Sequence, residues 1–328
     1  MNLKSFMFFS ILMTSTIITV TSNNWIGMWM GMEINLMSLI PLLYEKKNMM
    51  SSQSMMIYFL TQSISSIILL CSILTSKFIF YNNFENLPQT MLIISLMIKM
   101  ASAPFHMWLP EIMTNLSWLN CMILMTWQKI APMTILSNTI NNPTIIIFIL
   151  MSSIMGALGG INQTSFRKLM AYSSINHLSW MMTLMVMEKF WFMYLMLYSM
   201  IMLMMIIMLN KKNIFFVNQV ATFNLPILEK ITISMLMMSM GGLPPFMGFL
   251  LKWMVIQNMI NSSMWLLLLT MMMMSLITLF FYIRMMYPLI MIYNTKTTWS
   301  NMKFNNKVTL SILTLNLLFP LVLIMPVF

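Results

Sequence analysis

The stretch Leu96–Glu111, LMIKMASAPFHMWLPE, decides how the rest of this sequence is interpreted. It begins as an apolar helix that contains Lys99, and Pro104 then interrupts that helix. Proline removes a backbone donor and breaks the helical hydrogen-bond ladder, so a buried helix rarely continues through it. An ionisable residue beside a broken helix indicates a transport site when the segment lies in a membrane. The alternative is a simple kink with a lysine that reaches to the membrane surface.

The composition is that of an integral membrane protein. Of 328 residues, 60% are hydrophobic and only 7% are charged, and the mean hydropathy is +0.85. Soluble proteins are about one quarter charged, so a soluble domain of this size would not contain so much apolar surface. Residues 1–20 lead into Asn23, Asn24 and a second apolar stretch, so we expect no cleavable signal peptide.

Several classes of site are not expected. Cys71 and Cys121 lie in separate apolar stretches without a C-x-x-C pair, which argues against disulfide frameworks, zinc ribbons and iron–sulfur clusters. The 50 methionines include the plain apolar run 271–274, without the Cys or His neighbours of a soft-metal site. Glycines at 156, 159 and 160 lack a dinucleotide-binding context and predict close helix packing. The net charge of +11 lies in short loops, which fits membrane topology rather than nucleic-acid binding.

Apolar stretches of about 20 residues, the length of a membrane span, recur along the whole chain. We predict an all-α polytopic membrane protein whose single transmembrane domain (1–328) has about eleven transmembrane helices, at residues 3–21, 25–43, 54–76, 89–117, 119–137, 143–161, 169–187, 190–209, 227–260, 263–287 and 307–327. The fourth and ninth stretches are too long for one straight helix and contain internal breaks.

The basic residues predict the orientation. One side of the membrane would receive ten of them: Lys4, Lys46, Lys47, Arg167, Lys168, Lys211, Lys212, Lys296, Lys303 and Lys307. The other side would receive only Lys77 and Lys189. This asymmetry supports an odd number of spans and an N-terminus on the positively charged side.

The two broken stretches predict an internal repeat. The fourth reads SAPFHMWLP around its break and the ninth reads GGLPPFMGFLLKW, so both place Pro-Phe inside an overlong apolar segment with a lysine nearby. They lie five spans apart, and an odd offset makes the two halves inverted, as in transporters with discontinuous helices. We place the first repeat at about 1–140, with broken helix 89–117, and the second at about 141–287, with broken helix 227–260. Helix 307–327 follows.

Five ionisable residues fall near the centre of predicted spans or beside a break: Glu33, Lys99, Lys129, His177 and Lys252. A buried charge costs about 2.5–3.5 kcal/mol, so these groups should face one another or internal water. Glu33 and Lys99 form the natural ion pair, which could also be purely structural. Burial disfavours the charged form of Lys129, which makes it a candidate proton carrier. His177 can relay a proton, or it can be a histidine satisfied by a helix contact.

Three further ionisable residues are less certain candidates. His106 directly follows the first break and is expected to line a cavity there. Glu111 is expected to cap the second half-helix near its surface. Arg284, near the end of its span, is expected to extend to the membrane surface.

Specific motifs resemble a known family over nearly the whole chain: Trp25–Leu43 (WIGMWMGMEINLMSLIPLL), Lys99–Glu111 (KMASAPFHMWLPE), Trp127–Pro132 (WQKIAP), Arg167–Met181 (RKLMAYSSINHLSWM) and Gly241–Trp253 (GGLPPFMGFLLKW). The chain resembles the NADH dehydrogenase subunit 2 family, the mitochondrially encoded antiporter-like membrane subunits of respiratory complex I. The composition is similar to that of insect and other arthropod members.

This resemblance implies a proton-translocating subunit in the mitochondrial inner membrane, with its N-terminus in the matrix and its C-terminus in the intermembrane space. It implies that Glu33 and Lys99 form the family's charge pair, that Lys129 is the central lysine, and that Lys252 is the lysine of the second broken helix. His177 would link the lysines.

It also implies that this chain binds no cofactor, since NADH, FMN, iron–sulfur clusters and ubiquinone belong to other subunits of the complex. The partners would be other membrane-arm subunits and phospholipids such as cardiolipin. Related antiporters outside complex I share the motifs, so a stand-alone cation/proton antiporter is the alternative. A structural scaffold that retains inactive ion pairs is a third hypothesis.

Overall fold

The computed structural model describes residues 3–44, 49–78, 86–139, 143–222, 226–295 and 307–324. Within these ranges the regular secondary structure is helical, apart from an isolated bridge between Ser165 and Phe216, so the all-α prediction is confirmed there. The chain divides into two compact units, Met1–Ser152 and Ser153–Phe328. The loop lysines at 46, 47, 296 and 303, and the end of predicted span 307–327, lie outside the described residues.

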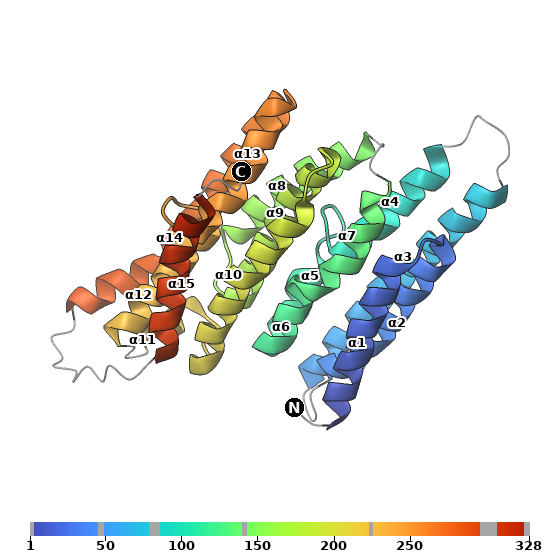
Figure 1. Cartoon of the computed structure of the whole chain (residues 1–328). Helices are drawn as coiled ribbons and strands as arrows, with labels where there is room; N and C mark the ends of the chain where they lie inside the picture. The colour runs from blue at the N-terminus through green and yellow to red at the C-terminus, as the bar shows by residue number, and fades with distance from the viewer. Residues whose placement is uncertain are drawn as a thin grey trace. The chain divides into compact units, whose positions relative to one another are not determined.

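The first unit contains helices α1 to α7 and the start of α8 (Figure 1). Helix α2 packs against α1 and α3, and α3 packs against both α4 and α5. The bounds are α1 Leu3–Thr21, α2 Trp25–Leu43, α3 Met49–Phe78, α4 Asn86–Met100, α5 Trp108–Asn115, α6 Trp118–Met125, the 3₁₀ turn η1 Trp127–Lys129, α7 Ile130–Ser137 and α8 Thr144–Gly160.

The second unit is built around α12, which contacts α10, α13, α14 and α15. Its helices after α8 are α9 Phe166–Val186, α10 Trp191–Lys212, α11 Val217–Thr222, α12 Ile227–Gly241, α13 Met247–Asn261, α14 Trp265–Thr295 and α15 Lys307–Ile324.

Four described helices are long and apolar enough to cross a membrane on their own: Trp25–Leu43, Met49–Ser76, Trp191–Lys212 and Trp265–Pro288. Shorter apolar helices lie in predicted spans 3–21, 89–117, 143–161 and 307–327. The other three spans contain α9, the series α6, η1 and α7, and the pair α12 and α13. Each predicted span therefore contains described helix, while the count of eleven crossings stays a prediction.

The break between α4 and α5 contains the proline that the sequence singles out. Ala101 takes a left-handed conformation (φ 59°) and its amide donates to the Ile98 carbonyl (3.1 Å), while the Ser102 amide donates to the Met97 carbonyl (3.0 Å). These are the two bonds of a Schellman motif. The Ile98 carbonyl also accepts the indole N–H of Trp108 on α5 (3.2 Å). Carbonyls that the break releases are thus paired within the protein, as an apolar environment requires.

The break between α12 and α13 repeats this cap. Gly242 is left-handed (φ 73°), its amide donates to the Ser239 carbonyl (3.0 Å), and the Leu243 amide donates to the Met238 carbonyl (3.3 Å). Pro-Phe begins three residues after the left-handed residue in both breaks. The same type of cap before the same dipeptide supports the predicted internal repeat.

Glycine permits close backbone approach at two places in the second unit. A side-chain carbon on Gly156 of α8 would lie 2.7 Å from the backbone nitrogen of Asn176 on α9, which confirms the predicted helix packing there. A side-chain carbon on Gly248 of α13 would overlap the carbonyl oxygen of Ser239 on α12. The two halves of the second broken helix therefore touch through their backbones.

Arg284 on α14 contacts the loop that follows α8. Its partly buried guanidinium donates to the backbone carbonyls of Ile161 and Gln163 (2.9 Å to Gln163), while its expected position at the membrane surface stays a prediction. Carbonyls at a helix C-terminus carry partial negative charge and lack partners within the helix. The arginine therefore joins α14 to the end of α8.

Replacing Gly248 by alanine should destabilise the protein strongly, because the new methyl group would meet backbone that cannot rotate away. We expect a loss of at least about 2 kcal/mol, the scale of overpacking in a tight core. Thermal denaturation in mild detergent measures this loss. Gly241→Ala is the matched control, because its nearest neighbour would be the Leu279 side chain at 3.6 Å, an ordinary contact. Equal stability of the two variants would contradict the backbone contact.

Candidate functional site

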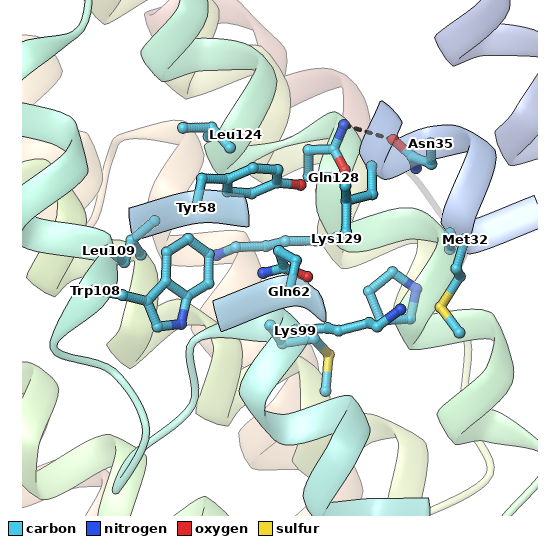
Figure 2. A pocket seen from close by; sticks show the side chains of 14 residues that line it. Met32, Asn35, Tyr58, Gln62, Lys99, Trp108, Leu109, Leu124, Gln128 and Lys129 are labelled. Carbon is cyan, nitrogen blue, oxygen red and sulfur yellow. Dashed lines mark hydrogen bonds between the residues drawn. The ribbon is translucent and has the colours of Figure 1, made fainter. Parts of the chain in front are cut away.

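A small cavity in the first unit brings together two of the predicted lysines. Its volume is about 30 Å³, room for about two water molecules. Figure 2 shows Lys99 and Lys129 among its lining side chains, with Gln62 between them. The complete lining is Met32, Asn35, Leu36, Tyr58, Gln62, Lys99, Met100, Trp108, Leu109, Leu124, Gln128, Lys129, Ala131 and Pro132.

Lys129 lies at an irregular point in the helical path. It ends the 3₁₀ turn η1, which separates α6 from α7, and its side chain is only 3% exposed. The turn follows Thr126, whose hydroxyl and amide both donate to the Met122 carbonyl (2.7 and 3.0 Å). In Figure 2 the Lys129 side chain extends from this turn toward Trp108. Short 3₁₀ segments inside helices often mark functional hinges, so the backbone at Lys129 is a candidate for movement.

Amide side chains in the same cavity were missed by the sequence interpretation. The Gln128 Nε2 group donates to Asn35 Oδ1 (2.8 Å), and Gln62 is 5% exposed. These polar side chains lie inside apolar helices, where each needs a partner. Their positions inside the apolar predicted spans 25–43, 54–76 and 119–137 could have identified these amide side chains from the sequence. They give the cavity hydrogen-bonding groups that can hold water between the lysines.

Glu33 and Lys99, the predicted ion pair, interact electrostatically without a direct bond. Glu33 lies on α2 with a half-buried side chain, and its carboxylate interacts electrostatically with Lys99 at the end of α4. Within the described residues the two groups form no direct ion pair. Glu33 is also absent from the cavity lining, because the face of α2 that reaches the cavity carries Met32, Asn35 and Leu36.

The two less certain residues lie apart from the cavity lining. His106 is 2% exposed in the segment between α4 and α5, and its Nδ1 lies 3.2 Å from the Pro104 carbonyl oxygen. His106 does not line this cavity, and its expected role at a cavity beside the break stays a prediction. Glu111 is exposed in the first turn of α5, where a carboxylate interacts favourably with the helix dipole, as predicted.

Lys252 on α13 lies against the break that precedes its own helix. Its side chain is 7% exposed, and its ammonium donates to the Gly241 carbonyl (2.6 Å), the last residue of α12. That carbonyl lies at the negative end of a half-helix, so the bond is charge-assisted when the lysine is protonated. A side-chain carbon on Gly242 would lie 2.7 Å from Cδ and Cε of Lys252, so glycine leaves the lysine its space.

His177 on α9 is enclosed by tyrosines of α10. It is 5% exposed, its Nδ1 lies 2.8 Å from the Tyr194 hydroxyl, and its ring centre lies 4.8 Å from that of Tyr198. Tyr194 and Tyr198 are themselves fully buried. The hydroxyl partner of His177 could not be read from the sequence, since α10 looks like a uniformly apolar span.

An ion pair that the sequence interpretation overlooked joins α10 to α12. Lys212 Nζ lies 2.9 Å from a carboxylate oxygen of Glu229, whose side chain is 4% exposed. Glu229 occupies the first turn of α12, where negative charge is favourable. The pair fixes the start of the second broken helix.

Both units therefore hold buried basic side chains that contact polar groups instead of bulk water. A buried lysine or histidine with such partners can bind and release a proton at low cost in rearrangement. The cavity lined by two of these lysines has room for water.

Comparison with known proteins identifies the family of this chain. Residues 22–278 match the family model described as NADH:quinone oxidoreductase/Mrp antiporter, TM. The chain is 43% identical over 311 residues to NADH-ubiquinone oxidoreductase chain 2 of Anopheles gambiae, covering 92% of this chain and 91% of the mosquito protein.

Solved structures show the same fold at low sequence identity. A chain of respiratory complex I from Thermus thermophilus matches with a TM-score of 0.84 and 17% identity, covering 99% of this chain and 79% of that one. A chain of the Mrp complex from a Dietzia species matches with a TM-score of 0.72 and 14% identity, covering 84% and 58%. Together with the sequence match, these findings show that the chain belongs to the NADH-ubiquinone oxidoreductase chain 2 family of antiporter-like membrane proteins.

Proposed function

We propose that this chain is a proton-translocating membrane-arm subunit of NADH:ubiquinone oxidoreductase, respiratory complex I, in the mitochondrial inner membrane. The observation that carries the proposal is the pair of lysines, half-buried Lys99 and buried Lys129, that line one water-sized cavity. The family match over most of the chain supplies the context for that cavity.

We further propose a topology of eleven spans, two of them discontinuous at the breaks after α4 and α12. The N-terminus would lie in the matrix and the C-terminus in the intermembrane space, because the basic loops then face the matrix. The repeated helix cap and Pro-Phe dipeptide support two inverted repeats of about 1–140 and 141–287.

Each candidate residue then has a defined role. Glu33 would modulate the charge on Lys99 through space, Lys99 and Lys129 would exchange a proton through the cavity, and Lys252 would be the carrier in the second unit. His177, hydrogen-bonded to Tyr194, would relay protons within that unit. The ammonium of Lys252 donates to the Gly241 carbonyl, which holds the end of this side chain at the break between α12 and α13.

The electron-transfer chemistry would occur elsewhere. This chain would bind none of NADH, FMN, iron–sulfur clusters or ubiquinone, which other subunits would hold. Its partners would be neighbouring membrane-arm subunits and phospholipids such as cardiolipin. A stand-alone cation/proton antiporter is not favoured, because the sequence relatives are chain 2 proteins, whereas the similarity to the Mrp complex shows only the fold.

Membership in the complex can be tested directly. Source membranes solubilised in mild detergent and separated on a native gel should show this chain co-migrating with the band that oxidises NADH. Repeated recovery of a free or small oligomeric chain would contradict the proposal and would revive the antiporter hypothesis.

Lys129→Met should remove a proton carrier while preserving side-chain length and apolar packing. We expect NADH-driven proton translocation to fall by at least about tenfold, the lower range for loss of a positioned proton-transfer group. The measurements are protons moved per NADH oxidised and the oxidation rate. The exposed Lys189 provides the matched control Lys189→Met, which should leave both unchanged. Unaltered stoichiometry and rate in Lys129→Met would exclude the role.

Tyr194→Phe should weaken translocation because it removes the hydroxyl that contacts His177 and keeps the ring. Loss of one hydrogen bond predicts a decrease of about two- to tenfold in proton translocation, with assembly preserved. The surface tyrosine variant Tyr287→Phe serves as the control, since that side chain is 61% exposed. A normal rate in Tyr194→Phe would mean that His177 does not depend on this hydroxyl.

A further inference from the structure

The cavity contains a direct side-chain link between the helix of Glu33 and the turn of Lys129. Asn35 lies two residues after Glu33 on α2, and Gln128 immediately precedes Lys129 in η1. The Gln128 Nε2 group donates to Asn35 Oδ1 at 2.8 Å, a bond that Figure 2 shows at the edge of the cavity. Asn35 is 4% exposed, so this bond is shielded from bulk solvent.

The position of this bond matters because Glu33 itself does not reach the cavity. Met32, Asn35 and Leu36 form the face of α2 that lines it. Successive helix residues are rotated by about 100°, so the carboxylate of Glu33 lies to one side of this face. Among the three lining residues, Asn35 is the one whose side chain can hydrogen-bond to the Lys129 turn.

The segment that donates the bond, η1, is an irregular part of the cavity wall. The η1 turn interrupts two α-helices, and its Lys129 amide donates to the Thr126 carbonyl at a long 3.3 Å. A 3₁₀ turn has poorer hydrogen-bond geometry than an α-helix and can change its conformation more easily. A single side-chain bond next to Lys129 can therefore influence where the lysine points.

We propose that Asn35 and Gln128 are positioning residues that couple the Glu33 helix to Lys129. Their hydrogen bond holds the η1 turn against α2, so that a shift of α2 on a change of charge at Glu33 moves the Lys129 side chain within the cavity. This inference rests on the proposed function, because it assumes that Lys129 carries protons.

The alternative is that the two buried amides only satisfy each other. The chain offers a matched control for this alternative, since Asn120 on α6 also donates to α2, at the Leu42 carbonyl (3.1 Å). Asn120 does not line the cavity. Its loss removes an amide hydrogen bond to the same helix without touching the lysines.

The test uses the assembled complex with variants of this chain, measuring protons moved per NADH oxidised, oxidation rate and assembly on a native gel. Asn35→Leu and Gln128→Met remove the bond while keeping the side-chain length, and each should lower translocation about two- to tenfold at normal assembly. The double variant should be no worse than the more severe single variant, because both remove one link. Asn120→Leu should behave like the unmodified chain.

The reciprocal exchange Asn35→Gln with Gln128→Asn keeps the combined length of the two side chains and should restore translocation to within about twofold. The proposal is overturned if the exchange rescues nothing, if the single variants are harmless, or if Asn120→Leu is equally damaging. Loss of assembly in both single variants would also overturn it, since the pair would then be required for folding.

Lys129→Met, measured in parallel, distinguishes a failure of the proposed coupling role from a failure of the proposed function. If it abolishes translocation while the amide variants do nothing, the coupling role fails and the proposed function stands. If it has no effect, the proposed function itself fails.

Discussion

The structure depends on one constraint: where one helix ends and the next begins in an apolar environment, the carbonyls at the helix end must be paired. Both breaks meet it in the same way, with a left-handed cap residue and a side-chain donor from the half-helix that follows. Trp108 supplies the donor in the first break and Lys252 in the second. The second donor is ionisable, so the group that satisfies the backbone there is also a group that can hold a proton.

This dual use explains how buried lysines are retained at acceptable cost. An isolated charge in a membrane core is unfavourable, but a lysine that donates to a helix C-terminal carbonyl has an electrostatic partner. In the first unit, Lys99 and Lys129 share a cavity with amide side chains and room for about two waters. The surroundings of each lysine therefore differ, with a fixed carbonyl in one unit and an adaptable polar cavity in the other.

Much of the fold and part of the site could be predicted from the sequence. Apolar stretches gave the helices, Pro104 and Pro245 marked the interruptions, and charges within apolar sequence identified Lys99, Lys129, Lys252 and His177 as buried or cavity-lining groups. These predictions succeeded because burial of charge and loss of a backbone donor are local costs that a sequence reveals. The functional roles of these residues stay predictions.

The partners of those residues were decided by tertiary structure. The His177–Tyr194 and Asn35–Gln128 bonds join residues on different helices, and Arg284 donates to two carbonyls near the end of α8 that the sequence interpretation did not identify. Helix rotation and spacing fix such pairs, and neither is encoded in hydropathy. The sequence by itself determined that the chain is helical, that helices break near Pro104 and Pro245 and that Lys129, Lys252 and His177 are buried, but it did not reveal the η1 turn or the buried Glu229. Only the tertiary structure decided which polar groups those charges meet, because that depends on packing between helices distant along the chain.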